Sequence, residues 1–297
     1  MKQRWGSYKN GNYMVHINLQ DGTKIRENNL DFFECGTVEA ADVKITNCCD
    51  MGCPMCHENS IPNGAHGDIM NLKFIDNLHP YTELAIGGGN PLEHPDLEAF
   101  LRKCKSLKLI PSMTINQTHF MKNIDFVKML VSEDLIYGLG VSLTNPTPEF
   151  INQIKKFPNA VIHVIAGLIP IYKLEEISKL DLKILILGYK QFRRGENLYL
   201  HESTTIDSKI NELKEILPVI IKNNWFKVVS FDNLAIKQLD PRRVLSDSEW
   251  DEFYMGDDGF ATMYVDCVKE EFARSSTSID RYPITDNIVD MFNVIRT

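Results

Sequence analysis

The sequence lacks any long apolar segment. Its longest mostly apolar stretch, residues 161–172, is too short to span a bilayer and includes His163 and Pro170. The beginning of the chain has no apolar run behind its basic residues, so nothing there is typical of a secretory signal. We therefore expect a soluble, cytoplasmic protein that makes no contact with a membrane.

An excess of positive charge is also absent. The 297 residues include 40 acidic and 32 basic side chains, which gives a formal net charge of −8. Because such a surface repels phosphate, we do not expect a long nucleic acid as partner. Internal repeats and low-complexity linkers are missing too. A hydrophobic content of 43% is enough for one large α/β domain or two modest ones.

Cysteine is scarce outside one segment. Four of the seven cysteines lie in residues 47–59, NCCDMGCPMCHEN, and no other part of the chain holds a second closely spaced pair. In a reducing cytoplasm, clustered cysteines are more often metal ligands than disulfides. The segment therefore predicts a metal site.

The spacing within this segment narrows the choice of metal. Cys49, Cys53 and Cys56 form a CxxxCxxC pattern, with a glycine and a proline between them that suit a tight loop. A closed zinc site needs four ligands, and His57 adjoins Cys56, so it is poorly placed to be the fourth. A [4Fe–4S] cluster held by only three cysteines leaves one iron open to a small molecule. Cys48 is expected to face away from this group.

Hydrophobic patterning predicts an α/β fold. From residue 38 to about residue 205, six apolar strand candidates alternate with helical segments, such as residues 71–78 and 97–107. This alternation is typical of a parallel sheet covered by helices. A β-hairpin with Asp21-Gly22 at its turn is expected before it.

The regular alternation of strands and helices ends after residue 205. A helix is expected from Ile206 onward, with Pro218 bending or ending it, and a further strand, a hairpin and a closing helix should follow. These patterns predict three regions, which are an N-terminal β extension (1–37), an α/β core (38–205) and a C-terminal α+β extension that covers the core (206–297).

Two segments together resemble the radical S-adenosylmethionine (radical SAM) superfamily. The CxxxCxxC motif directly follows the first core strand, and IGGGNPLEHPDL, residues 86–97, includes the end of the second. In that family the matching GGEP segment binds the amino group of SAM, which implies this role for Gly88, Gly89, Asn90 and Pro91. Asn90 replaces the usual glutamate, so a hydrogen-bond acceptor remains while the charge is lost. The segment DVKITNCCDMGCPMCHENS also resembles radical SAM proteins encoded by bacteriophages.

The resemblance implies further contacts with SAM. Met55 stands where the family carries an aromatic side chain before the last cysteine, so it should cover the adenine with apolar, polarisable surface. Ser142 ends the fourth core strand, Ile165 and Gly167 lie at the end of the fifth, and Tyr189 follows the sixth. By their positions these four residues are implied to contact the adenosine part of SAM.

Fold and activity follow from the same resemblance. The core would be a partial (β/α)6 TIM-like barrel in which the three cysteines bind a [4Fe–4S] cluster and SAM binds its open iron. An electron from a donor such as flavodoxin or ferredoxin would cleave SAM to a 5′-deoxyadenosyl radical, which abstracts hydrogen from a small-molecule, nucleotide or peptide substrate. Cys267 stands alone towards the C-terminus, so a second cluster is not expected. The alternative is a cluster- or zinc-binding structural protein without SAM turnover.

Overall fold

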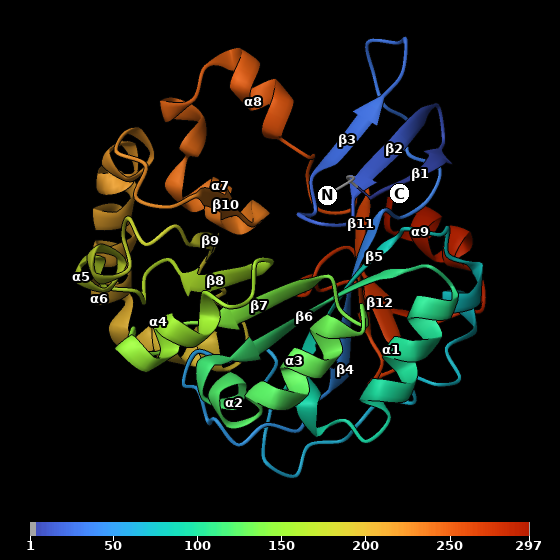
Figure 1. The fold of residues 1–297 in the computed structure, drawn as a ribbon, viewed down its shortest axis with the longest axis horizontal. Coiled ribbons are helices and arrows are strands. Elements are labelled where there is room, and N and C mark those ends of the chain that lie inside the picture. Colours follow the sequence, from blue (N-terminus) through green and yellow to red (C-terminus); the bar gives the residue numbers. More distant parts are fainter. Residues whose placement is uncertain (1–3, 297) are drawn as a thin grey trace.

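The computed structural model describes residues 4–296 and contains two sheets (Figure 1). Residues 1–3 of the predicted N-terminal extension and residue 297 of the predicted C-terminal extension lie outside the described part. The smaller sheet is antiparallel and consists of β1 (Trp5–Asn10), β2 (Tyr13–Asn18) and β3 (Lys24–Glu27). The predicted hairpin is confirmed as β2 and β3. The pattern WGSYKN does not reveal β1, because it contains few β-branched or apolar side chains.

The larger sheet has the strand order β10-β9-β8-β7-β6-β5-β4-β11-β12-β13. Strands β4 to β10 are parallel to one another, and the predicted alternation of six strands with helices is confirmed in β4 to β9. The bounds of the parallel strands are β4 (Ala40–Thr46), β5 (Glu83–Gly88), β6 (Ile110–Asn116), β7 (Gly138–Ser142), β8 (Ala160–Ile165), β9 (Lys183–Leu187) and β10 (Val228–Phe231).

The C-terminal part of the chain extends this same sheet at both ends. Strand β10 pairs with β9, and β11 (Thr262–Asp266) pairs in parallel with β4 at the other side. Two short antiparallel strands, β12 (Glu271–Ala273) and β13 (Tyr282–Pro283), complete it. The C-terminal residues therefore share a sheet with the cysteine-bearing core.

Helix α6 (Arg194–Lys222) crosses the predicted boundary between residues 205 and 206. Pro218 lies inside this helix and does not end it, because Leu217 and Ile220 on either side are fully buried and hold that turn against the core. The irregular backbone is instead at Glu202, whose φ of −126° and ψ of 20° mark a kink.

The remaining helices surround the large sheet (Figure 1). The predicted helix at residues 97–107 is confirmed as α1, which buries Leu97, Phe100, Leu101 and Cys104. Residues 71–78 form only a short 3₁₀ helix, η1 (Lys73–Asn77), since Leu72 offers no side-chain cap to a longer one. The other bounds are α1 (Leu97–Ser106), α2 (Gln117–Lys122), α3 (Ile124–Ser132), α4 (Pro148–Ile154), α5 (Ile171–Glu176), α7 (Asn233–Leu239), α8 (Asp247–Phe253), α9 (Ile288–Arg296), η2 (Pro91–Glu93) and η3 (Pro241–Val244).

The two faces of the parallel strands differ in exposure. On the outer face, side chains such as Val43, Ile86 and Ile162 are buried in the hydrophobic core with the helices. On the opposite face, which we call the inner face, residues such as Ser112 and His163 remain partly exposed. None of the helices in residues 4–296 is long and apolar enough to cross a membrane.

Helix α6 offers a matched test of this packing. Leu213 is fully buried, whereas Leu200 on the same helix is 72% exposed. We expect Leu213→Ala to lower the free energy of unfolding by about 2–5 kcal/mol, because it leaves a cavity in the core. Leu200→Ala should change it by less than about 0.5 kcal/mol. Urea unfolding of the two variants measures both values, and equal losses would contradict the placement of α6.

Candidate metal centre at the end of strand β4

A closed loop of residues 47–61, which we call the cysteine loop, follows strand β4. Near its two ends the Cys49 N–H donates to the Ile61 carbonyl (2.9 Å), and the Ile61 N–H donates to the Asn47 carbonyl (3.0 Å). Gly52 has a φ of 60°, a left-handed conformation that favours glycine. The loop thus turns back on itself at the carboxyl edge of the parallel strands, where the binding sites of such sheets gather.

Three thiols come together on this loop. Cys49, Cys53 and Cys56 are free and half-buried. Burial raises the pKa of Cys49, and the neighbouring Cys53 and Cys56 raise it further. Burial also raises the pKa of Cys53. The neighbouring Cys56 raises it further, and the charge of Arg194 lowers it. The thiols thus act on one another electrostatically, and a metal that binds them would have to displace their protons.

The other cysteines lie apart from this group. The Cys48 thiol donates to the Pro62 carbonyl at 3.0 Å. Its pKa is raised by burial and by Glu93 and Asp50, not by the three grouped thiols. The three remaining cysteines are buried, and they are Cys35, Cys104 and Cys267.

The glycine segment packs directly on the backbone of the cysteine loop. The Gly89 N–H donates to the Thr46 carbonyl (2.7 Å), and the Asn90 N–H donates to the Cys48 carbonyl (2.7 Å). A Cβ atom on Gly89 would lie 2.3 Å from the Cys48 oxygen, and Gly88 has a φ of 115°. Only glycine fits these two positions without moving the backbone.

Asn90 is only 1% exposed, and its side chain is engaged within its own segment. Its Oδ1 accepts from the Leu92 N–H (3.3 Å), and its Nδ2 donates to Glu93 Oε1 (3.2 Å). Asn90 therefore caps η2, in which Pro91 is buried. Neither the Asn90 side chain nor the N–H groups of Gly89 and Asn90 are therefore free to bind a ligand.

Three of the other predicted contact residues lie on the cysteine loop or the carboxyl edge of the sheet. Met55 is half-buried on the loop between Cys53 and Cys56. Ser142 ends β7, paired with Asn116 of β6, and Ile165 ends β8; both are half-buried. These positions leave their side chains accessible to a small molecule.

Gly167 and Tyr189 are placed differently. Gly167 is buried, and a Cβ atom on it would meet Ile206 of helix α6 at 2.8 Å. Tyr189 is 2% exposed, and its hydroxyl donates to the Gly195 carbonyl at 2.8 Å. Gly167 therefore allows close packing against helix α6. The hydroxyl of Tyr189 is already engaged in a hydrogen bond inside the protein.

A buried carboxylate fixes the end of the cysteine loop. Glu58 is 6% exposed and accepts from Lys44 Nζ of β4 (2.9 Å) and from the Tyr264 hydroxyl of β11 (3.1 Å). Arg193 reaches it at 3.5 Å and His57 Nε2 at 3.2 Å. Burial opposes its ionisation, but the hydrogen bond from His57 and the charge of Lys44 outweigh burial and hold the pKa of Glu58 well below its usual range.

The same network extends beyond Glu58. Lys44 also contacts the buried Asp266 of β11 at 3.1 Å. Arg193, just before α6, donates to the carbonyls of His57 (3.3 Å) and Glu58 (3.1 Å). The cysteine loop is therefore tied to β4, to β11 and to the start of α6 at once.

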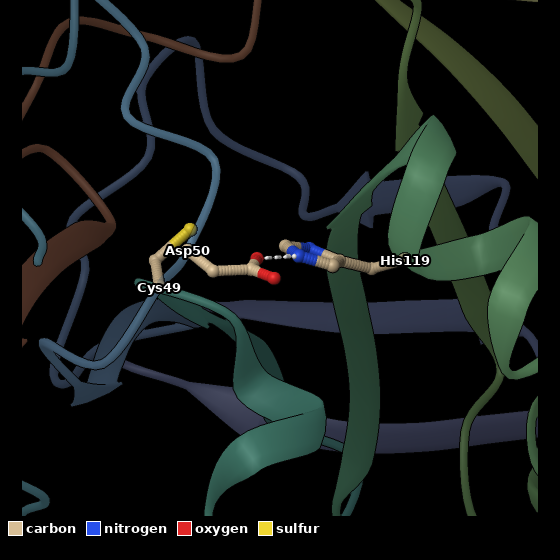
Figure 2. Close-up of side chains that lie close together, drawn as sticks. All are labelled: Cys49, Asp50 and His119. Carbon is tan, nitrogen blue, oxygen red and sulfur yellow. Dashed lines mark hydrogen bonds and ion pairs between the residues drawn. The ribbon is translucent and has the colours of Figure 1, made fainter. Parts of the chain in front are cut away.

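A histidine from helix α2 approaches the loop from the other side. Figure 2 shows Asp50 between Cys49 and His119, and His119 Nε2 lies 2.6 Å from Asp50 Oδ1. One ligand atom of each residue lies within 4.8 Å of the others, so this trio has donors that could hold a metal ion. The hydrogen bond from His119 lowers the pKa of Asp50.

Arg194 is a further residue of the site that sequence patterns did not reveal. Its charge opposes the rise in the Cys53 pKa, and one of its nitrogens donates to the Ser60 carbonyl (2.5 Å). Its Nε is buried without an acceptor in the described part of the chain. Arg194 and His119 each follow the carboxyl end of a core strand by a few residues. Because binding sites gather at these strand ends, this position was the signal in the sequence that could have pointed to both residues.

Comparisons with known proteins give a shared fold. No known family profile matches the sequence, and no curated protein is detectably similar to it. Among solved structures, the chain is similar to Streptococcus suis SuiB bound to the precursor peptide SuiA and to SuiB bound to S-adenosylmethionine. In each case the TM-score is 0.60 and the identity 12%, over 97% of this chain and 88% of that one. This chain therefore has the fold of SuiB.

The Glu58 network predicts a pH-dependent stability. Because the pKa of Glu58 is lowered on folding, its charge stabilises the protein above the unfolded value of about 4.3, and this contribution is lost as the pH falls below it. Glu58→Gln should therefore cost about 1–3 kcal/mol at pH 7. The difference from the natural chain should shrink as the pH falls from about 5 to 3.

Urea unfolding across this pH range measures the effect, with Glu212→Gln as the control. Glu212 is exposed on α6, and its replacement should leave the stability and its pH dependence nearly unchanged. A constant difference between Glu58→Gln and the natural chain at all pH values would contradict the assigned charge.

Proposed function

We propose that this protein is a radical SAM enzyme whose core is a partial (β/α)6 barrel. The observation that carries the proposal is the group of three thiols, Cys49, Cys53 and Cys56, on one loop at the carboxyl edge of a parallel sheet. A fold similar to that of SuiB, which has been solved with S-adenosylmethionine, supports it. The three-region division of the chain and a cytoplasmic location belong to the same proposal.

The residues present fit an iron–sulfur cluster. Three thiols are available, and Cys48 turns to another partner. Arg194 brings a positive charge and a buried Nε–H that lacks an acceptor beside Cys53, which suits a cluster with anionic thiolates and sulfides. Cys49, Cys53 and Cys56 would hold the cluster and leave one iron for SAM.

The glycine segment fits the amino acid end of SAM. Gly88 and Gly89 let the end of β5 pack directly on the backbone of the cysteine loop, so a ligand held by the loop would lie next to this segment. We assign Gly88, Gly89, Asn90 and Pro91 to this end, with the Asn90 amide holding the turn. Contacts with adenosine are proposed for Met55, Ser142, Ile165, Gly167 and Tyr189, the last two through backbone or apolar surface.

When bound, cluster and SAM supply reductive cleavage to methionine and a 5′-deoxyadenosyl radical that abstracts hydrogen from substrate. The chain's own residues bind and orient these groups and exclude water. The Glu58 network holds the cysteine loop in one position, which such an orientation requires. The electron donor would be a flavodoxin or ferredoxin. Because SuiB has been solved with a precursor peptide, we include a peptide among the proposed substrates, together with a small molecule or a nucleotide.

Anaerobic reconstitution with iron and sulfide tests this function. The natural chain should take up a [4Fe–4S] cluster and release 5′-deoxyadenosine with SAM and dithionite. Cys53→Ala should lose the cluster and reduce that release by at least about 100-fold, because a ligand is missing. The adjacent Cys48→Ala is the matched control and should keep both. A Cys53→Ala variant that retained a full cluster would refute the ligand assignment.

A second candidate is a structural zinc site, which the trio of Cys49, Asp50 and His119 favours. Cysteine, carboxylate and imidazole are all zinc ligands. If zinc is the native metal, the anaerobically purified protein contains one zinc and stays colourless, and His119→Ala loses it. His201→Ala, on exposed α6 surface, should not. Metal analysis of these proteins separates zinc from iron, and zinc that survives His119→Ala would rule this trio out.

A further inference from the structure

The inner face of the parallel sheet carries small residues on one side of a charged residue, Asp42. Asp42 of β4 lies in register with Ala85 of β5, and Ala85 with Ser112 of β6. Lys44, the next inward residue of β4, is in register with Gly87, and a Cβ atom on Gly87 would meet nothing within 4 Å. Small residues thus flank Asp42 on the β5 side, whereas on its other side Tyr264 of β11 is in register with it.

Asp42 is a carboxylate without a partner. Its side chain is exposed to solvent on the inner face of the sheet. Partial desolvation by the protein around that face raises the pKa of Asp42 to about 6; Lys190 opposes the rise, and Asp258, Asp232 and Glu58 add to it. The Asp42 carboxylate forms no hydrogen bond or ion pair with any residue from 4 to 296.

The neighbouring carboxylates are already engaged. Asp232 accepts from the N–H groups of Gly188 (2.9 Å) and Ala235 (2.7 Å) and caps helix α7. Asp258 accepts from Asn233 Nδ2 at 2.7 Å. Glu58 belongs to the network that holds the cysteine loop. Asp42 is therefore the carboxylate of this group that remains for a ligand.

Lys190 is a cation without a carboxylate partner in the described part of the chain, as Asp42 is a carboxylate without a cation. It follows β9 and is half-buried, and its Nζ donates to Ser276 Oγ (2.9 Å) and lies 3.3 Å from His57 Nε2. No carboxylate in the described chain comes within ion-pair distance of it. Because His57 adjoins Cys56, Lys190 stands next to the cysteine loop, while Asp42 lies two strand residues before Lys44. Their opposite charges act on each other without pairing.

We propose that the substrate of this site is zwitterionic, with an ammonium group that binds Asp42 and a carboxylate that binds Lys190. This inference rests on the proposed function, since it places the substrate between the inner face and the cysteine loop. Each group would replace water at one unpaired charge, and charge-assisted hydrogen bonds are the strong ones. Amino acids and peptide ends or side chains carry such groups.

Binding of ω-amino acids tests the charges directly. The probes are 5-aminopentanoate and its homologues, with pentanoate and pentylamine as controls that each lack one charge. In calorimetric titrations of the reconstituted full chain, 5-aminopentanoate or a homologue should bind at least about tenfold more tightly than either control. Asp42→Asn and Lys190→Met should each abolish that preference. Asp280→Asn and Lys237→Met, at exposed positions elsewhere, should retain it.

The outcomes separate this inference from the proposed function. Equal binding of pentanoate, an unchanged preference in Asp42→Asn or no binding of any homologue would overturn the zwitterion assignment. Release of 5′-deoxyadenosine by the natural chain is measured without any probe. If it occurs while the preference is missing, only the substrate class is wrong. If the preference appears without release, the charge assignment stands and the radical SAM function fails.

Discussion

The buried charge of Glu58 is the constraint on which the candidate site depends. A carboxylate with 6% exposure would be costly alone, so it requires the cations and hydroxyl that surround it. Lys44 of β4, Tyr264 of β11 and Arg193 just before α6 each reach the same side chain. Satisfying this one charge therefore fixes the cysteine loop relative to β4, β11 and α6.

Backbone contacts act at the other end of the same loop. The glycine segment after β5 lies so close to Cys48 that no side chain separates the two backbones. The loop is thus held at its start by main-chain hydrogen bonds and at its end by the charge network. The thiols between these two anchors are free and half-buried, which leaves them available for a metal.

Local patterns predicted what is locally determined. Apolar spacing found the α1 helix and the six core strands, and the Asp-Gly turn found the β2–β3 hairpin. The CxxxCxxC spacing and the glycines placed two adjoining loops, although their assignment as SAM contacts stays a prediction. The prediction that Pro218 bends or ends the helix was wrong, because tertiary packing outweighs the local cost of proline in α6.

Partners that are distant in sequence could not be read in the same way. Nothing near Glu58 signals Tyr264, and nothing near Asp50 signals His119, because only the folded sheet brings these residues together. The extension of the large sheet by β10 and β11 was missed for the same reason. Strand order is a property of the whole chain and not of any segment.

The pairing of Lys44 and Glu58 with β11 has a consequence for the order of assembly. Tyr264 and Asp266 follow Glu58 by about two hundred residues, so a chain emerging from the ribosome exposes its cysteines long before their support exists. Until β11 docks beside β4, Glu58 lacks its hydroxyl partner and Lys44 lacks Asp266. Maturation of a metal centre at these thiols in its final geometry is therefore coupled to completion of the sheet.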